Sequence, residues 1–220
     1  MVPTISSDDR LRLLWEAGSL LGKLHNLPPP GKSEALDIPR GNYEKWRSRN
    51  LPILEDNLAF LVSVGELTNP QVDRVRALVA QARPRLFQSE TALVHGDFSG
   101  QNILVRNSPS VMKICAIIDW GNIGVDALEA DYEMVMLDVL LPVPDSSSNV
   151  KCYDKTHFQD ICCAFEKGYE VERGIGIDWG VMRAHVLLQW VKRCVNHYDR
   201  KPPVSRSLAA PIRMAISLDF

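Results

Sequence analysis

Apolar residues recur every three or four positions along most of the chain, and this spacing predicts a mainly helical protein. The first such helix is expected to begin within residues 6–9, which supply capping side chains and first-turn acids, and to end at about His25, before a cluster of prolines. A second helical region is expected at 40–66, with a break or kink at Pro52. A third helix is expected at 69–83, capped by Asn69 and ended by Pro84. The remaining helices are expected at 156–172, 179–198 and 208–218.

Two short apolar runs in the middle of the chain have the pattern of β-strands. Residues 102–105 and 113–118 flank the turn signal Asn-Ser-Pro-Ser at 107–110, so they predict an antiparallel hairpin. Residues 121–126 are expected to be a loop, and a helix follows from about Leu128. The fold class is therefore α+β, mainly helical, with one small β-hairpin.

Three polar side chains are expected to meet at one end of this hairpin. Asp97 lies in the loop before the first strand, Asn102 opens that strand and Asp119 closes the second, so the last two come close across an antiparallel pair. Hard oxygen ligands of this kind suit a magnesium ion that bridges phosphates. The alternative is that Asp97 and Asp119 are ordinary loop and strand-end carboxylates, which the joint match of order, spacing and strand context disfavours. Gly100 would supply a left-handed backbone if the loop between Asp97 and Asn102 needs one.

The motif formed by His-Gly-Asp at 95–97, Asn102 and Ile-Asp-Trp at 118–120 resembles that of the aminoglycoside phosphotransferase family of small-molecule kinases. Protein kinases have Arg at the position of Gly96 and Phe at that of Trp120, so both residues favour the small-molecule branch. Residues 21–28 are also similar to the end of the first helix in the larger, carboxy-terminal lobe of that family.

The resemblance implies a single phosphotransferase-like domain over residues 1–220 that corresponds to the carboxy-terminal lobe of a protein-kinase-like fold. The amino-terminal lobe, which bears a nucleotide-covering loop and a phosphate-pairing Lys, is expected to be absent. No Gly-rich loop and no strand with a buried Lys is visible before His95. A truncated gene product and a genuine single-lobe descendant both remain open.

The same resemblance implies ATP- and Mg2+-dependent phosphoryl transfer to a hydroxyl group of a small metabolite. It assigns catalysis to Asp97, metal and nucleotide binding to Asn102 and Asp119, and structural support to His95 and Asp131. Asp126 and Glu129 compete with Asp131 for the supporting role. Activity is expected to be weak or absent, because the phosphate-binding Lys is missing and this chemistry depends on positioning and charge neutralisation.

Two other functions remain open, so the sequence does not decide whether the chain is an enzyme. The first is a non-catalytic, pseudokinase-type module that binds a protein partner or a second copy at an exposed lobe edge. The second is an enzyme that uses the acidic site for acid/base chemistry without nucleotide. His25 is expected to be a core histidine bonded to backbone, with a ligand or base as the alternative.

Composition narrows the cellular setting. The net charge of -2 gives no electrostatic reason to expect binding to nucleic acid or to an anionic membrane. No apolar run of residues approaches the length of a membrane span. The five cysteines are odd in number and lack zinc spacing, which indicates reduced thiols and a cytoplasmic protein. Cys162, Cys163 and Cys194 are expected to pack as small hydrophobic residues.

Two further segments have no assigned chemistry. The arginines at 74, 76, 83 and 85 form a basic helix face, for which a phosphate-binding role and an ordinary solvated surface are the two interpretations. The stretch 142–155 is expected to be a flexible loop at the rim of the acceptor site.

Overall fold

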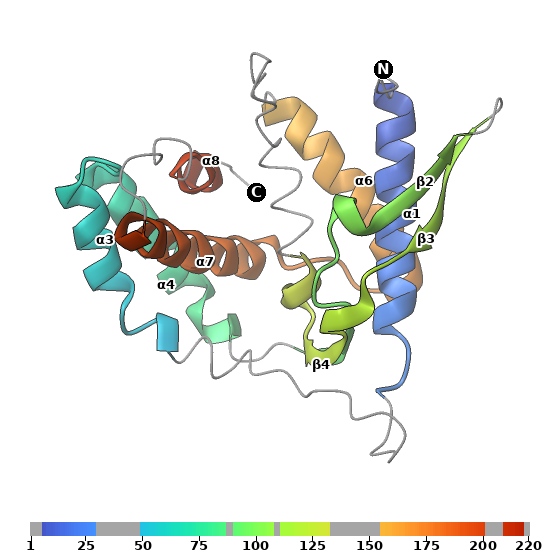
Figure 1. Cartoon of the computed structure of the whole chain (residues 1–220), viewed down its shortest axis with the longest axis horizontal. Helices are drawn as coiled ribbons and strands as arrows, with labels where there is room; N and C mark the ends of the chain where they lie inside the picture. The colour runs from blue at the N-terminus through green and yellow to red at the C-terminus, as the bar shows by residue number, and fades with distance from the viewer. Residues whose placement is uncertain are drawn as a thin grey trace. The chain divides into compact units, whose positions relative to one another are not determined.

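The computed structural model describes residues 6–29, 49–86, 90–107, 111–132, 155–200 and 209–217. These residues belong to two units, one within Met1–Gly41 and Thr91–Ile177 and the other within Asn42–Glu90 and Asp178–Phe220. The first unit contains helices α1 (Ser7–His25) and α6 (Lys155–Arg173), and the second contains α3 (Leu54–Ser63), α4 (Asn69–Leu86), α7 (Trp179–Arg200) and α8 (Ala210–Ser217) (Figure 1). The expectation of a mainly helical chain with few strands is confirmed. None of the described helices is long and apolar enough to cross a membrane.

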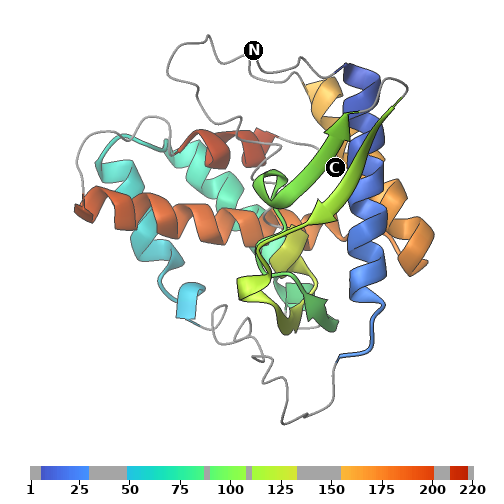
Figure 2. The ribbon, with the colours of Figure 1, turned by 45° about the vertical axis from the view of Figure 1, so that its right-hand side comes forward.

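The strands of the first unit form two antiparallel pairs. Strand β2 (Ile103–Asn107) pairs with β3 (Met112–Ile117), which confirms the predicted hairpin, and Figures 1 and 2 show this hairpin beside α1. Strand β1 (Thr91–Val94) pairs with β4 (Gly124–Ala127), so the expectation of a loop throughout 121–126 is wrong. The sequence Gly-Val-Asp-Ala has little strand propensity of its own, and its pairing depends on the buried apolar residues of β1.

Helix α1 begins as the sequence predicts. The Ser6 side chain accepts a hydrogen bond of 3.1 Å from the Asp9 N–H, and Asp8 and Asp9 lie in the first turn. The N–H of Ile114 on β3 donates to Glu16 at 3.0 Å, which attaches the hairpin to the middle of the helix.

Glycine residues allow α1 and α6 to approach each other closely. A Cβ atom at Gly18 would collide with the backbone carbonyl of Phe165, and one at Gly168 would collide with the carbonyl of Trp15. The Ser19 hydroxyl donates to Glu172 at 2.8 Å beside these contacts. Backbones at this distance gain many dispersion contacts, and a methyl group has no room between them.

In the second unit, α7 contacts α3, α4 and α8 (Figure 2). On one face of α7, Val181, His185, Leu188 and Val191 are buried, and Val195 is half-buried. The core of this unit consists of aliphatic side chains with no exposed surface, which include Leu58, Leu61, Val75, Leu187 and Ile212.

Both ends of α4 differ from the prediction. The Thr68 carbonyl accepts the first hydrogen bond of the helix, from the Val72 N–H at 3.0 Å. The Gln71 side chain accepts a hydrogen bond from the Thr68 N–H at 2.9 Å. The N-cap is therefore Thr68 and not Asn69. Pro84 does not end the helix, which continues to the fully buried Leu86. The carbonyl that loses its partner at Pro84 is that of Ala80, an exposed residue at which water can replace the missing N–H.

The described cysteines are reduced, and they differ in burial. Cys162 and Cys194 are buried as expected, whereas Cys163 is exposed, because neighbours on a helix point about 100° apart. Burial raises the pKa of Cys194 to about 12, so its thiol stays protonated at neutral pH. Residues 40–48 of the second expected helix, Cys152 and nearly all of the expected rim 142–155 lie outside the described residues.

The packing of α1 on α6 predicts that Gly18→Ala and Gly168→Ala each lower the free energy of unfolding by about 1–3 kcal/mol, because the new methyl group meets a backbone carbonyl. In an unobstructed helix the same change stabilises by roughly 0.5–1 kcal/mol. Urea denaturation measures the difference, with the exposed neighbour Lys167→Ala as the control. Stabilisation of both glycine variants would contradict the close approach.

Candidate functional site

Asp97 and Asn102 are joined by hydrogen bonds within the loop that follows β1. The Nδ2 group of Asn102 donates to the carbonyl of Asp97 at 2.9 Å and to its Oδ2 at 3.0 Å. Asn102 is buried at the end of a short 3-10 turn (Gly100–Asn102), while Asp97 is half-buried. The amide therefore fixes both the backbone and the carboxylate of Asp97.

These two bonds also determine the orientation of the Asn102 amide. Both partners on Asp97 are acceptors, so the nitrogen of the amide has to face them. The Oδ1 atom lies on the other side of the amide and is a neutral, hard oxygen donor of the kind that Mg2+ binds.

Asp119 lies two residues after the end of β3, the strand that pairs with β2 next to Asn102. The Ile118 N–H donates to the Asn102 carbonyl at 2.9 Å, and Ile103 lies opposite Ile117, so the ladder brings the end of β3 to the beginning of β2. Asp119 is exposed and has φ 61° and ψ 60°. It is the one non-glycine residue with positive φ among the described residues. This left-handed conformation costs about 1–3 kcal/mol, and such strain is concentrated at functional positions.

His95 connects the loop to the end of β3. Its side chain has no exposed surface, its Nε2 donates to the Ile118 carbonyl at 3.0 Å, and its Nδ1 accepts a longer bond of 3.3 Å from the Asp97 N–H. These partners assign a neutral imidazole with the proton on Nε2. The indole of Trp120 packs on the ring at a centroid distance of 4.5 Å and donates to the Ile117 carbonyl at 2.9 Å.

Asp131 holds the backbone of this loop from a helical segment, residues 129–132. Its fully buried carboxylate accepts hydrogen bonds from the N–H of His95 at 2.8 Å and of Gly96 at 2.7 Å. Asp126, one of the two alternatives for this supporting role, accepts a hydrogen bond from the N–H of Ala127.

His25 and Tyr169 extend this network into the core. His25 Nε2 lies 3.1 Å from the Asp131 carboxylate, and its Nδ1 lies 3.0 Å from the Tyr169 hydroxyl. The expectation of a backbone partner for His25 is therefore wrong, because both ring nitrogens contact side chains. Burial raises the pKa of Tyr132, whose ring packs edge-on against both residues, so its hydroxyl stays protonated. Sequence reasoning missed Tyr169, since its position on α6 has no local motif.

A positive φ occurs at Gly96, whereas the turn between Asp97 and Asn102 contains none, so Gly100 does not need the left-handed backbone. Gly96 has φ 79°, and a Cβ atom there would collide with the backbone carbonyl of Asn122. Two constraints thus require glycine at this position, the left-handed backbone and the contact with the segment after β3.

Asn102 and Asp119 are the residues at this end of the hairpin that could hold a metal ion. No cluster of three His, Cys, Asp or Glu side chains in the described ranges is arranged to hold a metal ion. Asn102 and Asp119 offer one amide oxygen and one carboxylate, and Mg2+ is commonly bound by one or two protein oxygens together with phosphates and water.

Comparisons with known proteins give a family match and a shared fold. The model of the APH family, described as "Phosphotransferase enzyme family", matches residues 3–148. A GDP complex of wild-type aminoglycoside 2'-phosphotransferase-IIIa is similar with a TM-score of 0.62 and 15% identity, over 97% of this chain and 64% of that one. A GDP and kanamycin complex of APH(2")-IIia has a TM-score of 0.62 and 16% identity, over 96% and 63%.

A streptomycin and ATP ternary complex of APH(2")-IIa has a TM-score of 0.51 and 16% identity, over 98% of this chain and 66% of that one. At these identities the similarity shows the fold alone. The chain spans less than two thirds of the length of each of these structures. No curated protein sequence matches it.

The network around Asp131 predicts that Asp131→Ala lowers the free energy of unfolding by about 3–5 kcal/mol, because two backbone N–H groups and His25 lose their acceptor in a buried place. Asp131→Asn, which keeps one acceptor oxygen, is expected to lower the free energy of unfolding by less than Asp131→Ala does. Urea denaturation is the measurement, and the exposed Asp160→Ala is the control, expected within about 0.5 kcal/mol of the wild type. Equal stability of Asp131→Ala and the control would refute the supporting role.

Proposed function

This chain belongs to the phosphotransferase enzyme family, and from that premise we propose that it transfers the γ-phosphoryl group of ATP to a hydroxyl group of a small molecule. The observation that carries the proposal is the pair of hydrogen bonds from the Asn102 side chain to Asp97. The backbone carbonyl of the same Asn102 accepts the N–H of Ile118, the residue before Asp119. This arrangement supports a shared task for the three side chains at one end of the hairpin.

In this proposal Asp97 is the catalytic residue. Its Oδ2 is occupied by Asn102, so its Oδ1 would accept the hydrogen bond of the acceptor hydroxyl and orient that oxygen for attack. The half-buried position leaves the carboxylate accessible while the loop backbone stays fixed. Fixed orientation is a large part of catalysis in phosphoryl transfer, because the protein forms no covalent bond to the transferred group.

Asn102 and Asp119 would hold the metal through the amide Oδ1 and the carboxylate. When bound, Mg2+ supplies neutralisation of the charge on the phosphate oxygens. The strained backbone of Asp119 and its exposure suit a side chain that meets a ligand from outside the chain. His95 and Asp131 would act as positioning residues, since they contact the loop and not the reacting groups.

We also propose that the chain is a single phosphotransferase-like domain that corresponds to the carboxy-terminal lobe of its relatives. The partial coverage of the similar structures supports this assignment. Nucleotide affinity of the chain by itself is then expected to be low, and the acceptor is a small hydroxylated metabolite in the cytoplasm. The similar structures that contain kanamycin and streptomycin suggest aminoglycosides as the first acceptors to test.

One observation favours a second candidate, a binding module without catalysis. The hairpin end exposes large apolar side chains, with Leu104 44%, Val105 39% and Ile118 40% exposed. A nucleotide base or the surface of another protein could cover them.

The proposal predicts ATP-dependent phosphorylation of at least one hydroxylated small molecule, measured as ADP release over a panel that includes aminoglycosides. Asp97→Asn keeps the shape of the side chain and removes the charge that orients the hydroxyl, so turnover is expected to fall by about 10²–10⁴-fold. Asp160→Asn removes the same charge from the surface and is expected to leave turnover unchanged. Equal turnover in the Asp97→Asn variant and the wild type would exclude the assigned role of Asp97.

A further inference from the structure

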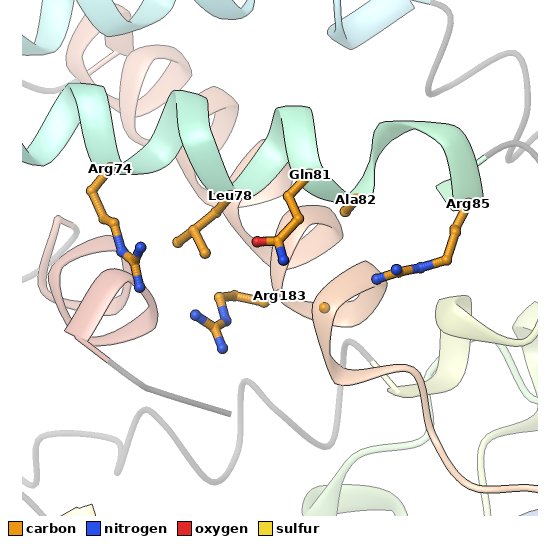
Figure 3. Close-up of a pocket in the computed structure, with 7 residues that line it drawn as sticks. Arg74, Leu78, Gln81, Ala82, Arg85 and Arg183 are labelled. Carbon is orange, nitrogen blue, oxygen red and sulfur yellow. The ribbon is translucent and has the colours of Figure 1, made fainter.

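The arginines of α4 belong to the second unit and not to the unit that contains the candidate site. Arg74 and Arg85 line a pocket of about 160 Å³, with Arg183 of α7 opposite them (Figure 3). The Arg85 guanidinium forms an ion pair of 2.7 Å with Asp178, which also accepts the Val181 N–H at the beginning of α7. This ion pair connects α4 to α7 and gives Arg85 a structural role.

In the first unit, Tyr169 and His25 form a buried connection to the Asp131 carboxylate. The side chains of all three residues have no exposed surface. The Tyr169 hydroxyl lies 3.0 Å from His25 Nδ1, and His25 Nε2 lies 3.1 Å from Asp131 Oδ2. The proposed reaction gives neither Tyr169 nor His25 a task, although this chain of hydrogen bonds ends at the group that holds the loop before Asp97.

Donor and acceptor properties fix the direction of the contact between His25 and Asp131. The carboxylate accepts the backbone N–H groups of His95 and Gly96, and these bonds stabilise its negative charge. An ionised carboxylate only accepts hydrogen bonds, so His25 Nε2 has to carry the proton of this contact. His25 therefore supplies a third donor to Asp131, on the same oxygen atom as the N–H of His95.

The Tyr169 hydroxyl fixes the orientation of the His25 ring. Rotation of the ring by half a turn about its bond to Cβ would put carbon atoms in place of both nitrogens, and a hydrogen bond at each nitrogen opposes that rotation. The hydroxyl is itself held by a hydrogen bond with the Tyr132 side chain. Without the hydroxyl, Nδ1 would lose its hydrogen bond in a buried place, and the contact with Asp131 would have to orient the ring alone.

The packing of α1 on α6 brings these two rings together. Gly22 lies three residues before His25, on the adjacent turn of α1. A Cβ atom at Gly22 would lie 3.0 Å from the Tyr169 carbonyl oxygen and 2.8 Å from the Glu172 Cβ, so the absence of a side chain lets α6 approach at this turn. The rings of His25 and Tyr169 meet edge-on at a centroid distance of 5.7 Å.

We propose that Tyr169 is a positioning residue, which acts through His25 and Asp131 on the loop that carries Asp97. The metal ligands of the proposed reaction are held in another way, because Asn102 and the residue before Asp119 are joined by the backbone pairing of β2 with β3. Loss of the Tyr169 hydroxyl therefore affects the orientation of Asp97 more than the binding of nucleotide. The inference deepens the proposed function, and its kinetic consequence rests on that function.

The test is amide hydrogen exchange of the whole chain, measured by NMR in the wild type and in Tyr169→Phe. This variant loses one hydroxyl group and keeps the ring that packs on His25, so it is expected to fold. Relative to the N–H of Leu21, a fully buried residue of α1, the N–H groups of His95 and Gly96 are expected to exchange faster by a factor of about ten or more.

Ser19→Ala is the matched control, because it also removes a buried hydroxyl group that connects α1 to α6. In this variant the N–H groups of His95, Gly96 and Leu21 are expected to change by the same factor. Circular dichroism establishes that both variants are folded.

Turnover supplies a second readout. The kcat for ADP release is expected to fall about tenfold in Tyr169→Phe with the KM for ATP unchanged, because Asp97 is displaced while the metal ligands stay in place. Ser19→Ala is expected to leave both constants unchanged. A wild type without turnover would contradict the proposed function, and the exchange measurement, which needs no turnover, would then decide this inference alone.

Three results would overturn the inference. The first is unchanged exchange of the His95 and Gly96 N–H groups in Tyr169→Phe. The second is a change by the same factor at His95, Gly96 and Leu21 in that variant, which would indicate a general loss of stability. The third is a raised KM for ATP with an unchanged kcat.

Discussion

The candidate site depends on one buried carboxylate. Asp131 accepts the backbone N–H groups of two successive residues, His95 and Gly96, and so fixes the chain immediately before Asp97. Each of these donors would cost about 1–3 kcal/mol if it were buried without an acceptor. The Asn102 amide then fixes the Asp97 side chain, and the positions of the polar groups follow from a small number of directional bonds.

The position of Asp131 is connected to the packing of two helices. His25 from α1 contacts its carboxylate, and Tyr169 from α6 contacts the other ring nitrogen of His25, so both helices contribute to one buried network. These side chains meet because Gly18 and Gly168 let the helix backbones approach. We therefore expect a change at this interface to affect the loop that carries Asp97, because His25 and Asp131 connect the two.

The spacing of apolar residues and turn signals predicted those parts of the fold that depend on residues close together in the sequence. The hairpin and the meeting of Asn102 with the end of β3 followed from two apolar runs and one turn signal, because register across a hairpin is a short-range property. Strand β4 was missed because its pairing depends on β1, and Tyr169 was missed because it meets His25 from 144 positions away in the sequence. The left-handed Gly96 was not predicted, since the contact that requires glycine there comes from Asn122, beyond the hairpin. The roles of the site residues in catalysis stay predictions.

The most direct test of the account is calorimetric titration of the chain with ATP in the presence and absence of magnesium. The account predicts magnesium-dependent binding in the wild type and in the surface control Asp160→Ala, and at least tenfold weaker binding in Asp119→Ala, because Asp119 would supply the carboxylate ligand. Absence of magnesium-dependent binding in the folded wild type, or equal affinity in Asp119→Ala and the control, would contradict the claim that the end of this hairpin is a nucleotide and metal site.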